Sequence, residues 1–105
     1  MSDRSGDGIR HREAAAIFGT HGPADAITTV LASRAVGINV EANPIVRRLL
    51  ETSEPATVAI MCACVAVAAI AWPTAANAID APPIAAIVVA GVGATVAATN
   101  LLVAL

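Results

Sequence analysis

The sequence predicts an all-α fold, an integral membrane bundle of three transmembrane helices plus a short amphipathic helix at the membrane interface. Hydrophobic residues make up 57% of the 105-residue chain, and charged residues only 13%. Asp80 is the only charged residue after Glu54, which leaves two uncharged runs, 56–79 and 81–105. Each run exceeds the roughly 20 residues that a helix needs to cross a bilayer. A soluble helix of this length would need a polar face, and neither run has one.

The chain is predicted to form one domain, because 105 residues are too few for two independent cores. Residues 1–12 are polar and are predicted to form a tail, and residues 13–105 a single membrane domain. No basic segment with a short apolar core and a cleavage site follows the N-terminus, so a secretory precursor is not expected. The helices are expected at about 13–37, 44–52, 55–72 and 82–105.

The first hydrophobic segment, residues 14–38, is interrupted by the sequence GTHGP. Pro23 lacks the backbone N–H that a helix interior needs. Two arrangements are therefore open: one kinked helix over about 13–36, or a short helix that ends near Gly19 and a second that starts at Pro23. We favour the kinked helix. A helix from Pro23 to Ile38 would be only about 24 Å long, which is short for a bilayer core.

A short amphipathic helix is predicted to follow this first span. Asn43 followed by Pro44 is typical of an N-cap with proline at the first helical position. The helix that they open combines apolar residues with Arg47, Arg48 and Glu51. We expect it to lie along the membrane interface.

The second and third spans carry terminal signals of their own. Ser53 and Pro55 are expected to cap the start of the second span. Pro73 is expected to end it, directly after Trp72, which is expected at the level of the lipid headgroups. Asp80 is expected to cap the third span.

Two stripes of small residues are predicted to pack against other helices, because helices in lipid associate through close contact and interhelical hydrogen bonds. The stripe on the third helix includes Asn100, whose side chain is expected to bond to a neighbouring helix or subunit. The stripe on the second helix lies opposite Met61, Val65 and Trp72, which are expected to face lipid. The stripes include Ala59, Ala63 and Ala66 in the second helix and Ala86, Ala90, Gly93 and Ala97 in the third.

The first helix gathers its polar groups on one side. His21, Asp25 and Thr28 fall within about 80° of one another around the helix axis, with Thr29 beside them. This polar stripe must therefore face protein or water. Arg34 lies on the opposite face and is expected to extend to the headgroups.

The pattern D-x-x-T-T, followed by G and then by E-x-N-P, resembles the signature of a family of small uncharacterised prokaryotic membrane proteins that is especially common in haloarchaea. The resemblance covers about residues 14–105 and implies three or so transmembrane helices. Asn100 resembles a polar residue often seen late in that family's last helix. By analogy with the family, we expect a cytoplasmic N-terminus and a location in the cell membrane. The matching residues are Asp25, Thr28, Thr29, Gly37, Glu41, Asn43 and Pro44.

The sequence departs from that family at two places. No lysine occurs in the second helix, where Met61 and its neighbours are apolar, and no basic residue occurs in the loop before the last helix.

Several roles are open for the polar stripe. A carboxylate at bilayer depth is costly and is a functional candidate by default. Asp25, with His21 and Glu41, would form a proton or cation site, to which Thr28 and Thr29 add oxygen ligands. Alternatively, the same groups only hold helices and loop together, with Asp25 favoured by a helix N-terminus and the threonines bonded to backbone carbonyls. The third possibility is docking of a partner.

We favour a structural or accessory subunit that packs through its small-residue faces onto other membrane subunits or copies of itself. The alternative is a minimal transporter or ion-conducting homo-oligomer that uses Asp25. No nucleophile–base pair, phosphate loop or metal-spaced cluster is present, so no enzyme, cofactor or metal site is expected. The net charge of -2 and the lack of a basic stripe argue against a nucleic-acid partner.

Overall fold

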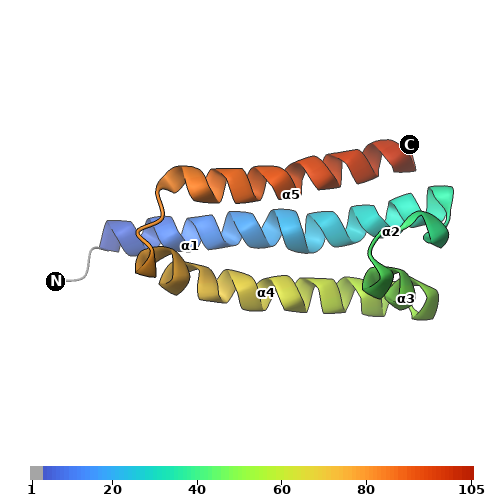
Figure 1. Ribbon diagram of the computed structural model, residues 1–105, viewed down its shortest axis with the longest axis horizontal. Coiled ribbons are helices and arrows are strands. Elements are labelled where there is room, and N and C mark those ends of the chain that lie inside the picture. Colours follow the sequence, from blue (N-terminus) through green and yellow to red (C-terminus); the bar gives the residue numbers. More distant parts are fainter. Residues whose placement is uncertain (1–3) are drawn as a thin grey trace.

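The predicted all-α fold is confirmed by the computed structural model, which describes residues 4–105 (Figure 1). No strand occurs in this part of the chain. Two helices, α4 and α5, are long and apolar enough to cross a membrane. In chain order the elements are α1 (Arg4–Gly19), the π-helical turn η1 (Thr20–Ala24), α2 (Asp25–Val36), the short 3-10 turn η2 (Ile38–Val40), α3 (Pro44–Thr52), α4 (Glu54–Ala78) and α5 (Pro83–Ala104).

A continuous helical rod, made of α1, η1 and α2, begins at Arg4 and not at residue 13. The predicted polar tail is therefore wrong for residues 4–12, and residues 1–3 lie outside the described part of the chain. The physical reason is that this segment has partners. The side chain of Arg10 donates hydrogen bonds to Asn77 Oδ1 (2.9 Å) and to the Ala81 carbonyl (2.8 Å), which hold it against the far end of α4.

Pro23 lies inside the rod without ending it, so the prediction of one helix through this segment, rather than two separate helices, is confirmed. A proline ring collides with the carbonyl four residues earlier in an α-helix. Here the backbone widens into a π turn, and the N–H of Asp25 donates to the carbonyl of Thr20, five residues earlier. Gly22 is buried within the turn, where an added Cβ would lie only 3.3 Å from the ring of Phe18. The turn thus bypasses the proline and lets the helix continue.

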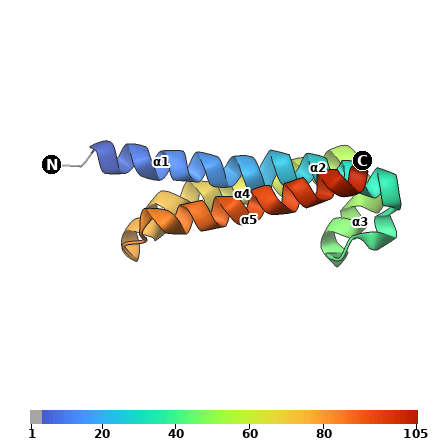
Figure 2. The same cartoon turned by 90° about the horizontal axis from the view of Figure 1, so that it is seen from above.

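The rod lies between the other two long helices (Figure 1). Its first half, α1, packs mainly against α4, and its second half, α2, packs mainly against α5. The turn η1 contacts both, whereas α4 and α5 make hardly any contact with each other. Seen from above, the three helices run side by side along the long axis of the molecule (Figure 2). The rod therefore changes its partner at the π turn.

The predicted start signals of α3 and α4 are confirmed. Asn43 Oδ1 accepts the backbone N–H groups of Ile45 (2.9 Å) and Val46 (3.3 Å), with Pro44 at the first helical position. Ser53 accepts the N–H of Ala56 (3.2 Å) at the start of α4. These side chains satisfy backbone donors that the first turn of a helix leaves unpaired.

Two other predicted boundaries are wrong. Helix α4 does not end at Pro73 but continues to Ala78, because a proline removes one backbone hydrogen bond and the following turn is held by contacts with α1. Asp80 does not cap α5. Its φ of 50° places it in the turn between the helices, where the N–H of Ala81 closes the reversal on the carbonyl of Ala76 (2.9 Å). Asp is one of the few residues that adopt this left-handed conformation readily.

Candidate functional site

Four polar side chains meet between α2 and α5, and we call them the α2–α5 cluster: Asp25, Thr28, Thr29 and Asn100. Asn100 Nδ2 lies 3.2 Å from Asp25 Oδ1, 3.3 Å from Thr28 Oγ1 and 3.2 Å from Thr29 Oγ1. The hydroxyl of Thr29 also donates to Asp25 Oδ1 (3.2 Å). The residues come from consecutive turns of α2 and from the last two turns of α5. The predicted polar stripe and the predicted polar residue of the last helix are therefore in contact.

The chemistry of the α2–α5 cluster is unusual in its excess of acceptors. An amide NH₂ has two hydrogens, yet Asn100 Nδ2 faces three oxygen atoms. The hydroxyl of Thr28 donates away from the amide, to the Ala24 carbonyl (2.7 Å). Neither Thr29 nor Asn100 carries a charge that would compensate the Asp25 carboxylate. The arrangement can join two helices, or it can present oxygen atoms to a cation.

His21 bonds to α5 and not to Asp25. Its Nε2 lies 2.7 Å from the carbonyl oxygen of Val89. Because a carbonyl only accepts, Nε2 must carry the hydrogen. The contact depends on Gly93, where an added Cβ would lie 2.7 Å from His21 Cδ2 and 2.8 Å from Thr20 Oγ1. At Gly93, the side chains of the π turn therefore lie too close to α5 for a larger residue to fit between them.

Glu41 and Asn43 lie in the loop after α2 and do not bond to Asp25. Glu41 Oε1 accepts the backbone N–H of Asn43 (3.1 Å), which steadies the start of α3. Glu41 nevertheless borders the α2–α5 cluster, because it lines a cavity of about 110 Å³ together with Thr29, Ser33 and Asn100. Three signature residues, Thr29, Gly37 and Glu41, therefore line one small space.

On α5, the predicted small-residue stripe faces the rod. Ala86, Gly93 and Ala97 are buried, and Ala90 is half-buried. The contact is close because Gly and Ala let the two helix backbones approach each other.

On α4 the inward face differs from the predicted stripe. Ala59 and Ala63 are exposed and Ala66 is half-buried, whereas Ala69 is buried and Trp72 turns inward to the rod rather than outward to lipid. The physical reason is the bond that Trp72 makes to α1, which sets the rotation of this helix.

Arg34 has a partner that the sequence analysis did not name. Its Nε donates to Glu54 Oε2 at 2.7 Å, so Arg34 ties the end of α2 to the first turn of α4. Its extension to the headgroups stays a prediction.

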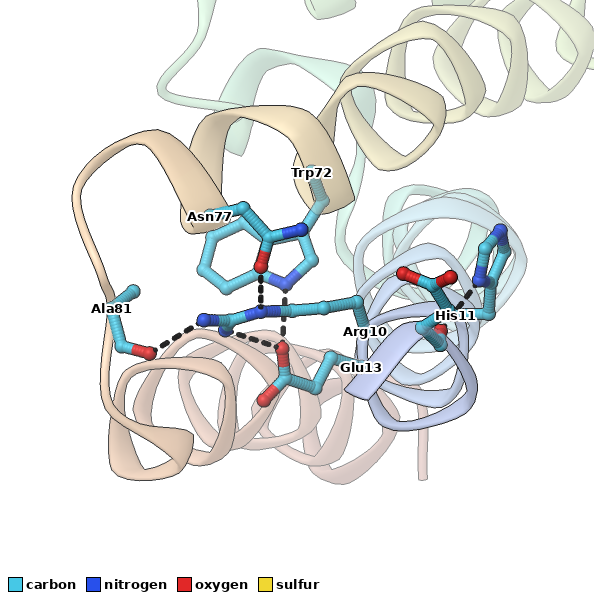
Figure 3. A network of polar contacts seen from close by, with 7 residues as sticks. Arg10, His11, Glu13, Trp72, Asn77 and Ala81 are labelled. Atoms are coloured by element: carbon cyan, nitrogen blue, oxygen red, sulfur yellow. Dashed lines mark hydrogen bonds and ion pairs between the residues drawn. The ribbon is translucent and has the colours of Figure 1, made fainter. Parts of the chain in front are cut away.

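A second polar network, which the sequence did not reveal, joins α1 to the end of α4 (Figure 3). Glu13 Oε1 accepts from Arg10 (2.9 Å) and from the indole N–H of Trp72 (3.0 Å). Arg10 also donates to Asn77 and to the Ala81 carbonyl, so one guanidinium holds α1, α4 and the following turn. The spacing of Arg10 and Glu13 was the available signal, because residues three apart are neighbours on a helix.

The network shifts the titration of Glu13, which lies just before the apolar segment of the first helix. The indole N–H of Trp72, together with the Arg10 guanidinium, lowers the pKa of Glu13 below its ordinary value of 4.5. The Glu13 side chain is only 9% exposed. Hydrogen bonds to the ionised carboxylate favour that form and outweigh the opposing effect of burial.

The sequence profile of a family described as a domain of unknown function, DUF5658, matches residues 16–105. The chain belongs to this family. No curated protein and no solved structure matches it. The DUF5658 region contains the whole α2–α5 cluster and Glu41, whereas Arg10 and Glu13 precede it.

Proposed function

We propose that this protein is a three-span integral membrane protein of the cell membrane, with a structural or accessory role rather than an enzymatic one. Helices α4 and α5 supply two spans. The rod supplies the third, because it runs beside them and its part from residue 14 to residue 36 is about 34 Å long. Helix α3 lies along the interface, with the apolar side chain of Ile45 72% exposed.

One observation supports the structural role: the polar stripe of the rod forms hydrogen bonds with α5 of the same chain. Asp25, Thr28 and Thr29 all bond to Asn100, and His21 bonds to the backbone of α5. In the described residues, no buried side-chain nitrogen or oxygen lacks a hydrogen-bond partner. Such interhelical bonds average about 0.6 kcal/mol each in membranes. The polar groups thus serve to fix α5 on the rod.

The partner of this subunit is another membrane protein or a second copy of the chain. Ala59 and Ala63 lie four residues apart on the exposed side of α4, which matches the small-residue spacing that lets helices associate closely in lipid. The N-terminus lies in the cytoplasm, by analogy with the family resemblance carried by the D-x-x-T-T and E-x-N-P residues.

Native mass spectrometry of the tagged chain, gently extracted from its own membrane, tests this role. We expect the chain to purify with unrelated chains or as a defined oligomer. Ala63→Leu should reduce the amount of this complex several-fold, because the larger side chain obstructs the face of α4 formed by Ala59 and Ala63. Ala68→Leu is the matched control, since it makes the same change on an exposed position about 140° away around α4. A lone monomer in both cases would contradict the accessory role.

A second function, ion conduction by a homo-oligomer, is favoured by one observation. The Asp25 carboxylate and two threonine oxygens surround the Asn100 amide nitrogen within 3.3 Å, and none of the hydrogen-bond partners found for Asp25 in residues 4–105 is cationic. Under this function, Asp25→Asn should leave assembly intact and abolish cation flux into proteoliposomes. Unchanged flux in the Asp25→Asn variant would rule out ion conduction through Asp25. If neither the wild type nor the variant conducts cations, and the variant weakens the α2–α5 contact, the structural role is favoured.

A further inference from the structure

An apolar groove runs between α1 and α5 on the side of the rod away from α4. It encloses about 440 Å³. Among the described residues its walls are mostly small or aliphatic, and the charged side chains that line it are Arg12 and Glu13. The residues that line it include Ile9, Arg12, Glu13, Ala16, Ile87 and Ala90.

The depth of the groove follows from the network next to it. Trp72 bonds to Glu13, and indole rings are enriched at the level of lipid headgroups. Arg12 directly precedes Glu13, so its guanidinium lies at the same level or just outside it. Ala16 and Ala90 lie deeper, in the direction of the π turn. The groove therefore has a cationic end at headgroup depth and an apolar end at acyl-chain depth.

Arg10 and Arg12 have different roles. The Arg10 side chain is only 14% exposed. It already donates to Glu13, Asn77 and the Ala81 carbonyl. Arg12 is exposed and makes no hydrogen bond or ion pair with any residue whose side chain the structure describes. Glu13 does not repel an anion strongly, because Arg10 pairs with its carboxylate.

We propose that this groove binds an anionic phospholipid. The phosphate lies against Arg12, since a guanidinium donates paired hydrogen bonds to phosphate oxygens. One acyl chain lies along Ala16, Ile87 and Ala90. Basic sites between membrane helices recognise anionic headgroups in this way. The proposal rests on the proposed membrane location and adds a specific lipid to it.

The test is a lipid titration of the full chain in detergent, followed by native mass spectrometry. Phosphatidylglycerol and phosphatidylcholine with the same acyl chains are the two probes. We expect phosphatidylglycerol to bind more tightly, and Arg12→Gln to weaken it about fivefold while binding of phosphatidylcholine stays unchanged. Arg48→Gln removes the same charge from exposed α3 at the opposite end of the molecule and is expected to have no effect.

A second variant tests the apolar half of the groove. Ala16 is exposed on α1, so Ala16→Leu fills the groove without disturbing the core, and we expect it to weaken both lipids. Equal losses in Arg12→Gln and Arg48→Gln would overturn the proposal, since they would mean diffuse charge attraction. A lipid-free dimer that Ala16→Leu abolishes would also overturn it, because protein would then occupy the groove. Recovery of the chain outside the membrane fraction would instead contradict the proposed membrane location itself.

Discussion

The two halves of the rod are held by different chemistry. At the α1–α4 end, a charged pair and an indole form the network of Arg10, Glu13 and Trp72. At the α2–α5 end, hydroxyls, an amide and a single carboxylate join the helices. Beside this cluster, the side chains of His21 and Thr20 pack directly against Gly93. Ion pairs suit a site near the water boundary, and close packing with neutral hydrogen bonds suits helix contacts in lipid. With the rod spanning the bilayer as proposed, this contrast would put the α2–α5 cluster nearer the bilayer centre than the network of Arg10, Glu13 and Trp72.

The largest effect should come from crowding the α2–α5 half. Gly93→Ala places a Cβ 2.7 Å from His21 Cδ2, so either the His21 ring must leave its hydrogen bond to Val89 or the helices must move apart. We expect a loss of about 1–3 kcal/mol in the free energy of unfolding, measured by denaturant titration in mixed micelles. Gly91→Ala is the matched control, because nothing lies within 4 Å of its added Cβ. In the double variant His21→Ala/Gly93→Ala, the loss of unfolding free energy caused by Gly93→Ala should be smaller, because the His21 ring is no longer there. If the losses of the two single variants simply added, this would argue against a contact between His21 and Gly93.

Removal of the interhelical amide should have a smaller effect. Asn100→Leu deprives Asp25 of one donor and separates both threonines from α5. We expect a loss of about 0.6–1.7 kcal/mol, the range of single polar contacts in membranes. A double-mutant cycle with Asp25→Asn measures the coupling. Zero coupling energy would mean that the contact does not hold the helices together.

The α1–α4 half can be weakened without touching the other. Trp72→Phe removes the indole N–H that bonds to Glu13 but keeps an aromatic ring. We expect a loss of about 0.5–1.5 kcal/mol, again by denaturant titration. Stability equal to that of the wild type would show that this bond contributes nothing.

The smallest effect is a dependence on pH confined to the α1–α4 half. The folded pKa of Glu13 is lowered, so protons bind first to the unfolded chain as the pH falls. The contribution of Glu13 is complete at neutral pH and is lost as the pH drops below 4.5 toward the folded pKa. Glu13→Gln should flatten this part of the stability–pH curve. A curve with the same slope in both proteins would assign the dependence to another carboxylate.

Local signals in the sequence predicted local structure well. The caps at Asn43 and Ser53 need only neighbouring backbone groups, and the stripe on α5 needs only a face that contains Gly93. The face of α4 was not predictable in this way. Alanine recurs all around that helix, and its rotation is set by a bond between Trp72 and Glu13, which lie 59 residues apart.

Contacts between residues that are distant in sequence also explain why the predictions for residues 4–12 and for the end of α4 are wrong. The sequence predicts a tail around Arg10 because the partners of Arg10, Asn77 and Ala81, are distant in sequence. It predicts a helix end at Pro73 because the proline rule describes one lost bond and not the contacts that compensate for it.

The π turn between residues 20 and 24 has a consequence for chain length. A one-residue slip in a helix rotates everything beyond it by about 100°. The turn holds the hydrogen-bond pattern one residue out of step with an α-helix, and this offset aims Asp25 and Thr29 at α5. Deleting a single residue there would restore an ordinary helix and leave Asp25 one turn above Thr20, still aimed at α5. Closing the turn into an α-helix without a deletion would instead rotate α2 by about 100° and swing its polar groups out of reach of Asn100. The pairing of helices in this protein therefore depends on a turn that absorbs one extra residue.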